Sequence, residues 1–334
     1  MTLAHVAQRA NVSVSTVSRY LRGQLKVNPD TAARIDEAVR ELKYEVTTPA
    51  CDRNPPQNPV IAMAVPELIN PFFAELTEAA AAAAAASNVS LLVGVSGLQA
   101  RREATLSDFV ADSDVIDGLI YVGMHRENEA LARAIGNGLP VVVLDEEISG
   151  TSTADTISVD NYGGAYQATA YLAQLGHRRI AHVAGPAELS TTRDRARGYR
   201  DAMADAGLDV HEDLVLHGPY TEQFGASTFP HLVHSGKAPS AVFVGSDIVA
   251  VGMLSAAELH GIRIPDDLSI VGCDGIGVGE WLRPRLTTLQ QPVADLARSA
   301  IDIVQTRIES PEHERIVRKF PLQLVVRGSA ARPR

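Results

Sequence analysis

The first 29 residues of the chain contain basic side chains and no acidic one. Between Asn11 and Gly23, the segment NVSVSTVSRYLRG adds several serine and threonine hydroxyls. Guanidinium groups bind phosphates, and small hydroxyl side chains can reach phosphates or base edges in the major groove of DNA. The chain of 334 residues has a net charge of −10, so only a local basic surface can meet phosphates. The N-terminal segment is therefore the candidate nucleic-acid contact. Its basic residues are Arg9, Arg19, Arg22 and Lys26.

Three short helices are expected to position these side chains. Apolar residues recur at helical spacing over 3–10, 14–21 and 29–42. Asn11 interrupts the pattern, and asparagine tolerates the left-handed backbone better than most residues. A helix, a tight turn and a second helix with small polar side chains are typical of a helix-turn-helix, with a surface helical hairpin as the alternative. The expected N-caps are Thr2, Ser13 and Asn28.

A proline-rich segment separates this all-helical domain, residues 1–45, from the rest of the chain. Residues 46–59 read VTTPACDRNPPQNP and contain four prolines and few apolar side chains. Proline removes a backbone donor and restricts the residue before it, so an extended linker is predicted here. The linker marks the boundary to a larger domain over residues 60–330.

The larger domain alternates apolar runs of strand length with helical segments. VIAMAV, VSLLVGV, DGLIYVG and PVVVLD form a first set, and RIAHVAG, LVLHG, SAVFVGS and LSIVGCD form a second. Continuous apolar strands that alternate with helices indicate parallel sheets covered on both faces. The fold class is therefore α/β, with two doubly wound parallel-sheet lobes behind the helical N-terminal domain. Ligands of such sheets bind at the carboxyl ends of the strands.

Several other classes of protein are disfavoured by what the sequence contains. No apolar run is long enough to span a membrane, no signal segment opens the chain, and the two cysteines fit a reducing compartment. We therefore expect a cytoplasmic protein. The run GCDGIGVGE over 272–280 departs from the dinucleotide pattern, and no HExxH or GxxxxGK motif occurs. An enzyme, a cofactor and a metal site are accordingly not expected.

The segment TLAHVAQRANVSVSTVSRYLRG resembles the N-terminal signature of the lactose-repressor (LacI/GalR) family. Further blocks resemble that family in the same order along nearly the whole chain, among them INPFFAEL, DGLIYVG, SDIVAVGML and GIRIPDDLSIVGCD. The resemblance implies a transcription regulator, in the first place a repressor, whose effector-binding lobes are similar to periplasmic sugar-binding proteins. It also implies a homodimer that binds a pseudo-palindromic operator.

The resemblance further implies which residues contact DNA. Val14 and Ser15 would approach the bases, and Arg19 would lie near a base or a phosphate. The chain departs from the family after Tyr44, where proline-rich sequence replaces the usual hinge helix. The proline-rich segment could place Arg53 in a narrow minor groove, or it could be a plain tether; the sequence is compatible with both. A ligand-binding protein with weakened specific DNA binding is therefore the alternative function. The DNA-binding candidates are Thr2, Val14, Ser15, Thr16, Ser18, Arg19, Arg22, Asn28 and Arg53.

Family position also implies the residues of the effector site. Arg195 and Asp274 are the favoured pair, because a guanidinium and a carboxylate each bond two neighbouring hydroxyls of a sugar. Aromatic faces would suit a sugar ring or a purine or nucleoside base, so both ligand classes stay open. Three of the candidates have a structural alternative to effector contact. Phe73 could belong to the hydrophobic core, and Asp160 and Asp247 could be helix caps. The effector candidates are Asn70, Phe72, Phe73, Asp160, Arg195, Tyr220, Ser246, Asp247 and Asp274.

Overall fold

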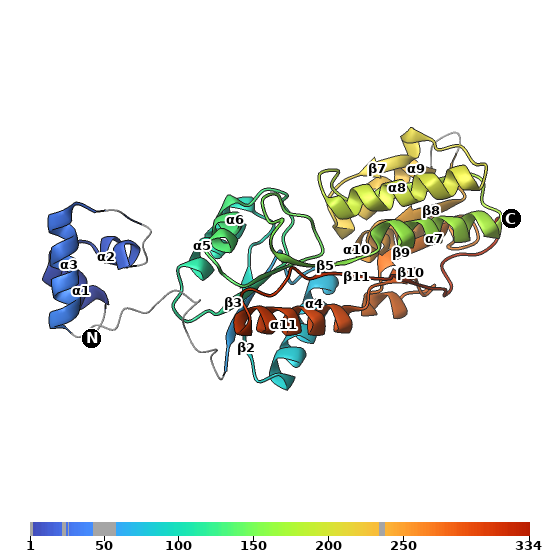
Figure 1. Cartoon of the computed structure of the whole chain (residues 1–334). Helices are drawn as coiled ribbons and strands as arrows, with labels where there is room; N and C mark the ends of the chain where they lie inside the picture. Colours follow the sequence, from blue (N-terminus) through green and yellow to red (C-terminus); the bar gives the residue numbers. More distant parts are fainter. Residues whose placement is uncertain (1–2, 22–24, 26, 43–57, 234–237) are drawn as a thin grey trace. The chain divides into compact units, whose positions relative to one another are not determined.

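The computed structural model describes residues 3–21, 25, 27–42, 58–233 and 238–334. The chain divides into two compact units, Met1–Pro56 and Gln57–Arg334, here called the head and the body (Figure 1). The linker predicted over 46–59 falls almost entirely outside the described residues. For a few residues within the described helices of the head only the backbone is described: Leu3, Ala4, Ser15, Ser18 and Arg19.

The head contains the three helices predicted from the sequence, α1 (Leu3–Ala10), α2 (Val14–Leu21) and α3 (Pro29–Glu41). Each helix contributes apolar side chains to one small core. Val17 of α2 and Ile35 of α3 are fully buried in it. The helical spacing of the apolar residues thus indicated the inward faces correctly. The remaining buried members of the core are Val6, Ala7, Ala10 and Ala38.

Short-range hydrogen bonds fix the ends of these helices. Asn11 has a φ of 54°, the left-handed conformation that turns the chain between α1 and α2. The Ser13 hydroxyl accepts a hydrogen bond from the Thr16 backbone N–H at 3.1 Å. The Asn28 side chain accepts one from the Thr31 backbone N–H at 2.8 Å. The predicted caps at Ser13 and Asn28 are confirmed, while Thr2 lies outside the described residues.

The body is built on two sheets. The first sheet has the strand order β11-β5-β4-β3-β1-β2, with every neighbouring pair parallel. The second has the order β12-β10-β9-β8-β6-β7 and is parallel except between β10 and β12. The first sheet comprises β1 (Val60–Val65), β2 (Ser90–Val95), β3 (Gly118–Tyr121), β4 (Val141–Leu144), β5 (Asp155–Val159) and β11 (Val317–Phe320). The second comprises β6 (Ile180–Ala184), β7 (Val215–His217), β8 (Ala241–Val244), β9 (Ser269–Asp274), β10 (Thr287–Gln290) and β12 (Gln323–Val325).

Helices pack on these sheets to form a first and a second lobe. Alternate residues of β1 belong to two different clusters: Ile61 and Met63 pack on the side of α4 and α11, and Ala62 and Ala64 on the side of α5 and α6. Both faces of the sheet are therefore covered, as a parallel sheet requires. The first lobe has α4 (Pro71–Ala86), α5 (Ala100–Ala111), α6 (Glu129–Gly136) and α11 (Val293–Glu309). The second has α7 (Asn161–Leu175), α8 (Ser190–Asp205), α9 (Glu222–Val233), α10 (Asp247–Leu259) and the short helices Glu212–Leu214 and Gly277–Glu280.

The lobes are not consecutive in the sequence, because the described chain crosses between them at three places. β5 leads into α7, β10 leads into α11, and β11 leads into β12 (Figure 1). The two-lobed α/β architecture is thus confirmed, and the simple order of one lobe after the other is replaced by a shared hinge of three connections. No helix in the described ranges is both long and apolar enough to pass through a membrane.

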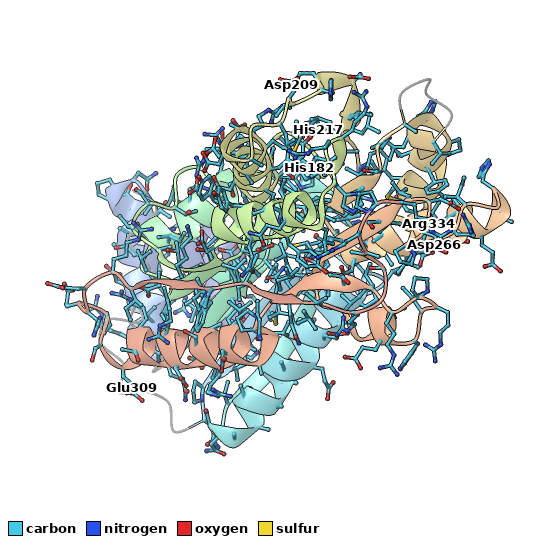
Figure 2. All side chains as sticks on the ribbon, turned by 90° about the vertical axis from the view of Figure 1, so that its right-hand side faces the viewer. His182, Asp209, His217, Asp266, Glu309 and Arg334 are labelled. Carbon is cyan, nitrogen blue, oxygen red and sulfur yellow. The ribbon has the colours of Figure 1, made fainter. Side chains whose placement is uncertain are left out.

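His182 of β6 illustrates how the second lobe buries a titratable group. Its ring stacks against Phe243 at 4.9 Å and against Tyr199 at 5.1 Å between centroids, and it is fully buried. Figure 2 labels His182 among the side chains of the second lobe. Nδ1 donates to the Phe243 carbonyl oxygen at 3.0 Å. Burial lowers the pKa of His182 to about 3, so the imidazole is neutral in the folded protein.

His182→Phe is expected to make the body less sensitive to acid. The pKa of His182 lies below that of an unfolded histidine, so the unfolded state binds the extra proton between about pH 6.5 and 3. The wild type therefore loses stability as pH falls through that window, with a slope approaching about 1.4 kcal/mol per pH unit from this group. Denaturant unfolding of the variant at several pH values should give a flatter profile. The matched control is the same substitution at His231, which is exposed.

Candidate effector-binding and DNA-binding sites

The described part of the head presents α2 with one face buried and one face exposed. Val17 is inaccessible to solvent, whereas Val14, one turn earlier, is 46% exposed. The Thr16 and Ser13 hydroxyls are 2.7 Å apart, so Thr16 lies at the exposed start of the helix. Asn28 is exposed, and its amide oxygen caps α3. Ser15, Ser18 and Arg19 lie on α2 with only their backbone described, and Thr2, Arg22 and Arg53 lie outside the described residues.

One of the basic residues of the head is paired within the head itself. Arg9 at the end of α1 forms an exposed ion pair with Glu41 of α3 at 2.6 Å. Its charge is therefore partly balanced by Glu41. The exposed face of α2 is consistent with the predicted DNA contact.

A buried polar cluster lies at the carboxyl ends of strands in the second lobe. Asp274 ends β9, Ser246 follows β8, and Arg195 projects from the second turn of α8. The Ser246 hydroxyl donates to Asp274 Oδ2 at 2.7 Å, and Arg195 Nη2 lies 4.0 Å from Asp274 Oδ1. These three candidates are each no more than 6% exposed. The structure therefore brings together the predicted cation, the predicted carboxylate and a hydroxyl.

Two further residues from the lobe crossings complete this cluster. Arg195 Nε donates to Asn161 Oδ1 at 2.8 Å, and Gln291 Nε2 donates to Asp274 Oδ1 at 3.0 Å. Asn161 follows β5 and Gln291 follows β10, the strands that lead from one lobe to the other. We call Asn161, Arg195, Ser246, Asp274 and Gln291 the effector cluster. Gln291 Oε1 is buried and has no hydrogen-bond partner among the described residues.

Electrostatics keep the cation of this cluster charged. Burial alone would lower the pKa of Arg195, but its neighbours Cys273, Tyr220 and Asp274 outweigh burial and the pKa of Arg195 is raised. Burial raises the pKa of Asp274, against the opposing influence of Arg195 and of its hydrogen bonds from Ser246 and Gln291. A buried guanidinium and a buried carboxylate with part of their hydrogen-bonding capacity free can bind hydroxyl groups with strong directional preference.

Tyr220 borders the same region. Its hydroxyl lies 3.0 Å from the Thr192 hydroxyl of α8, and burial raises the pKa of Tyr220 to about 12. The ring lies directly against Gly185 after β6, where an added Cβ would meet it at 2.1 Å. Gly185 is thus the residue that leaves room for the predicted aromatic wall.

Asp247 and Asp160 are held by the protein itself. Asp247 is fully buried and accepts from the Gly275 and Ile276 backbone N–H groups at 2.8 and 3.1 Å and from the Thr288 hydroxyl at 2.7 Å. It therefore fixes the loop after β9, and burial raises the pKa of Asp247 to about 7. Asp160 caps α7 by accepting from the Gly163 backbone N–H at 3.2 Å.

The candidates from the first lobe are likewise built into the fold. Asn70 caps α4 by accepting from the Phe72 backbone N–H at 3.1 Å. Phe72 and Phe73 are 4% and 5% exposed and meet edge to face at 5.2 Å. Both belong to the hydrophobic core cluster that includes residues of β1 and α4. Phe73 is therefore a core residue, which was its structural alternative. Among the described residues, no hydrogen bond or ion pair joins these three residues to the effector cluster.

A further carboxylate, not singled out from the sequence, faces the effector cluster from the first lobe. Asp145 follows β4, has a φ of 78° and is half-buried. Burial and the adjacent Glu146 raise the pKa of Asp145 to about 7, and both Arg195 and Asp274 are near enough to affect it. The sequence position of Asp145 could have identified it. Asp145 directly follows the buried strand PVVVL, where a polar side chain reaches the cleft edge of a parallel sheet.

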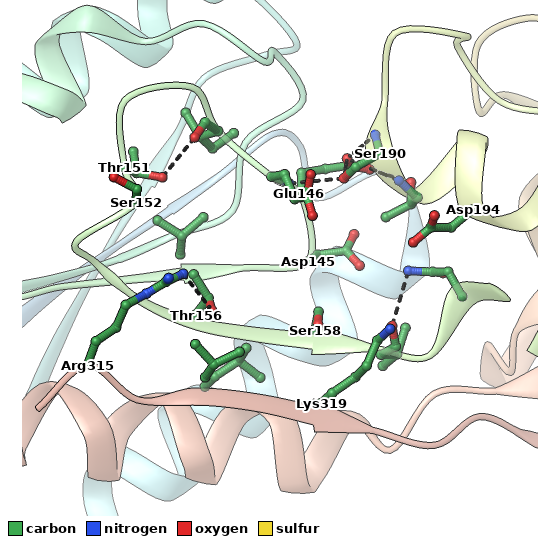
Figure 3. Close-up of a pocket in the computed structure, with 18 of the residues that line it drawn as sticks. Asp145, Glu146, Thr151, Ser152, Thr156, Ser158, Ser190, Asp194, Arg315 and Lys319 are labelled. Atoms are coloured by element: carbon green, nitrogen blue, oxygen red, sulfur yellow. Dashed lines mark hydrogen bonds between the residues drawn. The ribbon is translucent and has the colours of Figure 1, made fainter. Parts of the chain in front are cut away.

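Asp145 also lines a cavity of about 480 Å³. The cavity lies beside the strands β4, β5 and β11 of the first lobe and the first turn of α8 in the second. Figure 3 shows Asp145 in its wall, below Glu146. The cavity continues as far as Asn161 of the effector cluster, so the polar groups of both lobes adjoin one accessible space. Its hydroxyl-bearing lining includes Thr151, Ser152, Thr156, Ser158, Ser190 and Thr191.

Comparisons with known proteins agree with this architecture. Residues 2–46 match the model of bacterial regulatory proteins of the lacI family, and residues 169–330 match a periplasmic binding protein-like domain. The HTH-type transcriptional repressor CytR of Escherichia coli K12 is 31% identical over 328 residues, which cover 98% of this chain and 96% of that protein.

Solved structures show the same likeness. A complex of the transcriptional regulator CelR with cellobiose has a TM-score of 0.75 and 28% identity, and covers 98% of this chain and 99% of that chain. A LacI family regulator from Enterococcus faecium with bound ribose has a TM-score of 0.72 and 27% identity, over 82% of this chain and 99% of that one. The chain therefore belongs to the lacI family of bacterial regulatory proteins, and it is a DNA-binding transcription regulator.

Proposed function

We propose that the chain is a repressor that binds a pseudo-palindromic operator as a homodimer and releases or tightens its hold when a small hydroxylated effector enters the body. The observation that carries the proposal is the effector cluster. A buried guanidinium, a buried carboxylate, a hydroxyl and two amides meet beside two of the three lobe crossings, and Asp145 is near them in the other lobe. A ligand held between the lobes alters their closure, and this movement is what the operator-binding heads respond to.

A sugar is the first candidate for the effector. The charged and amide groups of the cluster each offer paired donors or acceptors, which match neighbouring hydroxyls on a sugar ring. Two similar structures hold sugars, cellobiose in one and ribose in the other. Tyr220 is half-buried beside the cluster, and an aromatic face there would suit a sugar ring and also a nucleoside, the second candidate.

Arg19→Ala is expected to weaken operator binding by about 1–3 kcal/mol, the range for an arginine bidentate to guanine. A footprint upstream of the chain's own gene supplies the operator fragment, and gel shifts at fixed salt measure the affinity. The control is Arg34→Ala, which removes the same charge from α3 of the same head. Equal losses in the two variants would show a nonspecific charge effect, and an unchanged affinity for Arg19→Ala would remove that residue from the recognition surface.

The homodimer is supported by the edge of the first sheet. β2 is an edge strand with the almost wholly apolar sequence SLLVGV, yet Leu92, Val93 and Val95 are 43–50% exposed. An exposed apolar edge strand is normally covered by a partner. Sedimentation equilibrium of the full chain tests this, with a monomeric mass as the contradicting result. Protected inverted half-sites in the footprint would give independent support.

Binding alone suffices for this control, so we assign the chain no catalytic turnover and place it in the cytoplasm with its operator. Chromatography of candidate sugars and nucleosides after incubation with the protein tests the first assignment. Conversion of any of them would contradict it.

A further inference from the structure

Glu146 links the two lobes through one carboxylate. It follows β4 in the first lobe and is 6% exposed. Its Oε2 accepts from the Ser190 backbone N–H at 2.8 Å, the Ser190 hydroxyl at 2.6 Å and the Thr191 backbone N–H at 3.3 Å. Its Oε1 accepts from the Thr191 hydroxyl. Figure 3 shows these bonds at the side of the cavity.

The donors belong to the start of α8, a helix that lacks a cap of its own. Its N-cap residue is Leu189, which makes no side-chain cap, and its first turn contains no acidic residue. The free N–H groups and the dipole of a helix N-terminus favour an anion. In this protein a carboxylate from the opposite lobe is that anion. The same helix carries Thr192 and Arg195. The start of α8, which the Glu146 carboxylate occupies, is therefore next to the effector cluster.

The other charges around this position add to its effect. Arg195 is the cation of the effector cluster, and it already bonds Asn161 and the Gly245 carbonyl oxygen and lies beside Asp274. Asp145 stands next to Glu146, and burial together with Glu146 raises the pKa of Asp145. Two cations line the far side of the cavity, and each already has a partner: Lys319 lies 3.5 Å from Asp160, and Arg315 donates to the Ala154 carbonyl oxygen at 2.7 Å. A negatively charged group at the start of α8 meets Asp145 and Glu146 and finds the donors of the helix occupied.

We propose that Glu146 is a specificity-determining residue that keeps anionic molecules out of the effector site. The site then accepts a free sugar or nucleoside and rejects its phosphate ester. The inference rests on the proposed function, since it concerns the same cleft. No role was assigned to Glu146 from the sequence. The chemical difference to which the regulator responds is then the absence or presence of a phosphate group on the ligand.

Removing the carboxylate should convert the start of α8 into a site for inorganic phosphate. The test compares thermal unfolding of the full chain in potassium phosphate with unfolding in potassium chloride of equal ionic strength. For Glu146→Ala, we expect the Tm of the body to rise by about 5 °C at a phosphate concentration about 100 times its Kd. Phosphate bound by the head affects every variant equally, so the difference from wild type isolates the body.

Glu147→Ala is the matched control, because Glu147 is the next residue and its side chain is exposed. It loses the same charge and should respond to phosphate as the wild type does. Glu146→Ser is the second variant, in case the alanine variant does not fold. Its smaller side chain also vacates the helix start, and the same gain is expected.

Three outcomes would overturn the proposal. The first is a wild type stabilised by phosphate as strongly as Glu146→Ala. The second is a folded Glu146 variant without any added response. Tighter binding of ribose 5-phosphate than of ribose by the wild type would overturn it as well. Gel shifts with operator DNA separate these failures from failure of the proposed function, because operator binding does not depend on the charge preference of the cleft.

Discussion

Replacing Asp274 by asparagine is expected to weaken effector binding by about 100-fold or more, in line with the cost of breaking a buried charge pair. Asp274 accepts from Ser246 and Gln291 and lies 4.0 Å from Arg195. The amide removes the negative charge, turns one acceptor into a donor and leaves the buried guanidinium less balanced. Asparagine keeps the side-chain shape and tolerates the φ of 125° found at this position better than alanine does.

Two measurements separate this effect from general damage. A thermal-shift screen of sugars and nucleosides on the wild type identifies a ligand, and calorimetry then gives its Kd for each variant. Gel shifts should show operator binding within a few-fold of wild type, because Asp274 lies in the body. Asp295→Asn, an exposed position on α11, is the matched control. Normal effector affinity in Asp274→Asn would refute the assignment of the cleft.

The helices of the head were predictable because their signals are local. Ser13 and Asn28 bond N–H groups three residues away, and Asn11 adopts its left-handed turn within one residue. Such interactions need no knowledge of the rest of the chain. The strands β1, β3, β4, β6, β8 and β9 were predictable for a related reason, since strands buried on both faces are continuously apolar. The edge strands β2 and β7 were found from their apolar runs as well, although they are only partly covered within the described residues.

The lobe crossings could not be predicted in this way. β5 reads DTISV and β11 reads VRKF, so neither is a continuous apolar run of the kind that marks β1, β3 and β4 of the same sheet. Whether such a short segment pairs with the first sheet or the second depends on contacts more than a hundred residues away. β11 pairs with β5, for example, although 160 residues separate them at the register pair Val317 and Thr156.

The effector cluster shows the same division. Arg195 and Asp274 were expected from the family resemblance, and the structure places them together. Gln291 was missed because it reaches the cluster only through the crossing that follows β10. Glu146 was missed because its donors lie on α8, 44 residues further along the chain. By contrast, the amide of Asn70 and the carboxylate of Asp160 are engaged as helix caps, a role that their sequence neighbours indicate directly.

The second large effect is expected in the head. Ile35→Ala should unfold the head and abolish operator binding while the body keeps its thermal transition and its effector affinity. Ile35 is fully buried where the three helices meet, and truncating a buried isoleucine costs about 2–5 kcal/mol. A unit of this size has a small core, with a total stability of about 3–5 kcal/mol or less. The loss is therefore comparable to everything that holds the head together.

Hydrogen exchange of the amides in α1, α2 and α3 measures the unfolding directly. Val14→Ala is the control, because it truncates another branched side chain of the head at a position that is 46% exposed. It should leave amide protection close to wild type, whatever it does to DNA affinity. The body forms a separate compact unit, so its exchange pattern should not change in either variant. Wild-type protection of the head amides in Ile35→Ala would mean that the described apolar core does not by itself stabilise the DNA-binding unit.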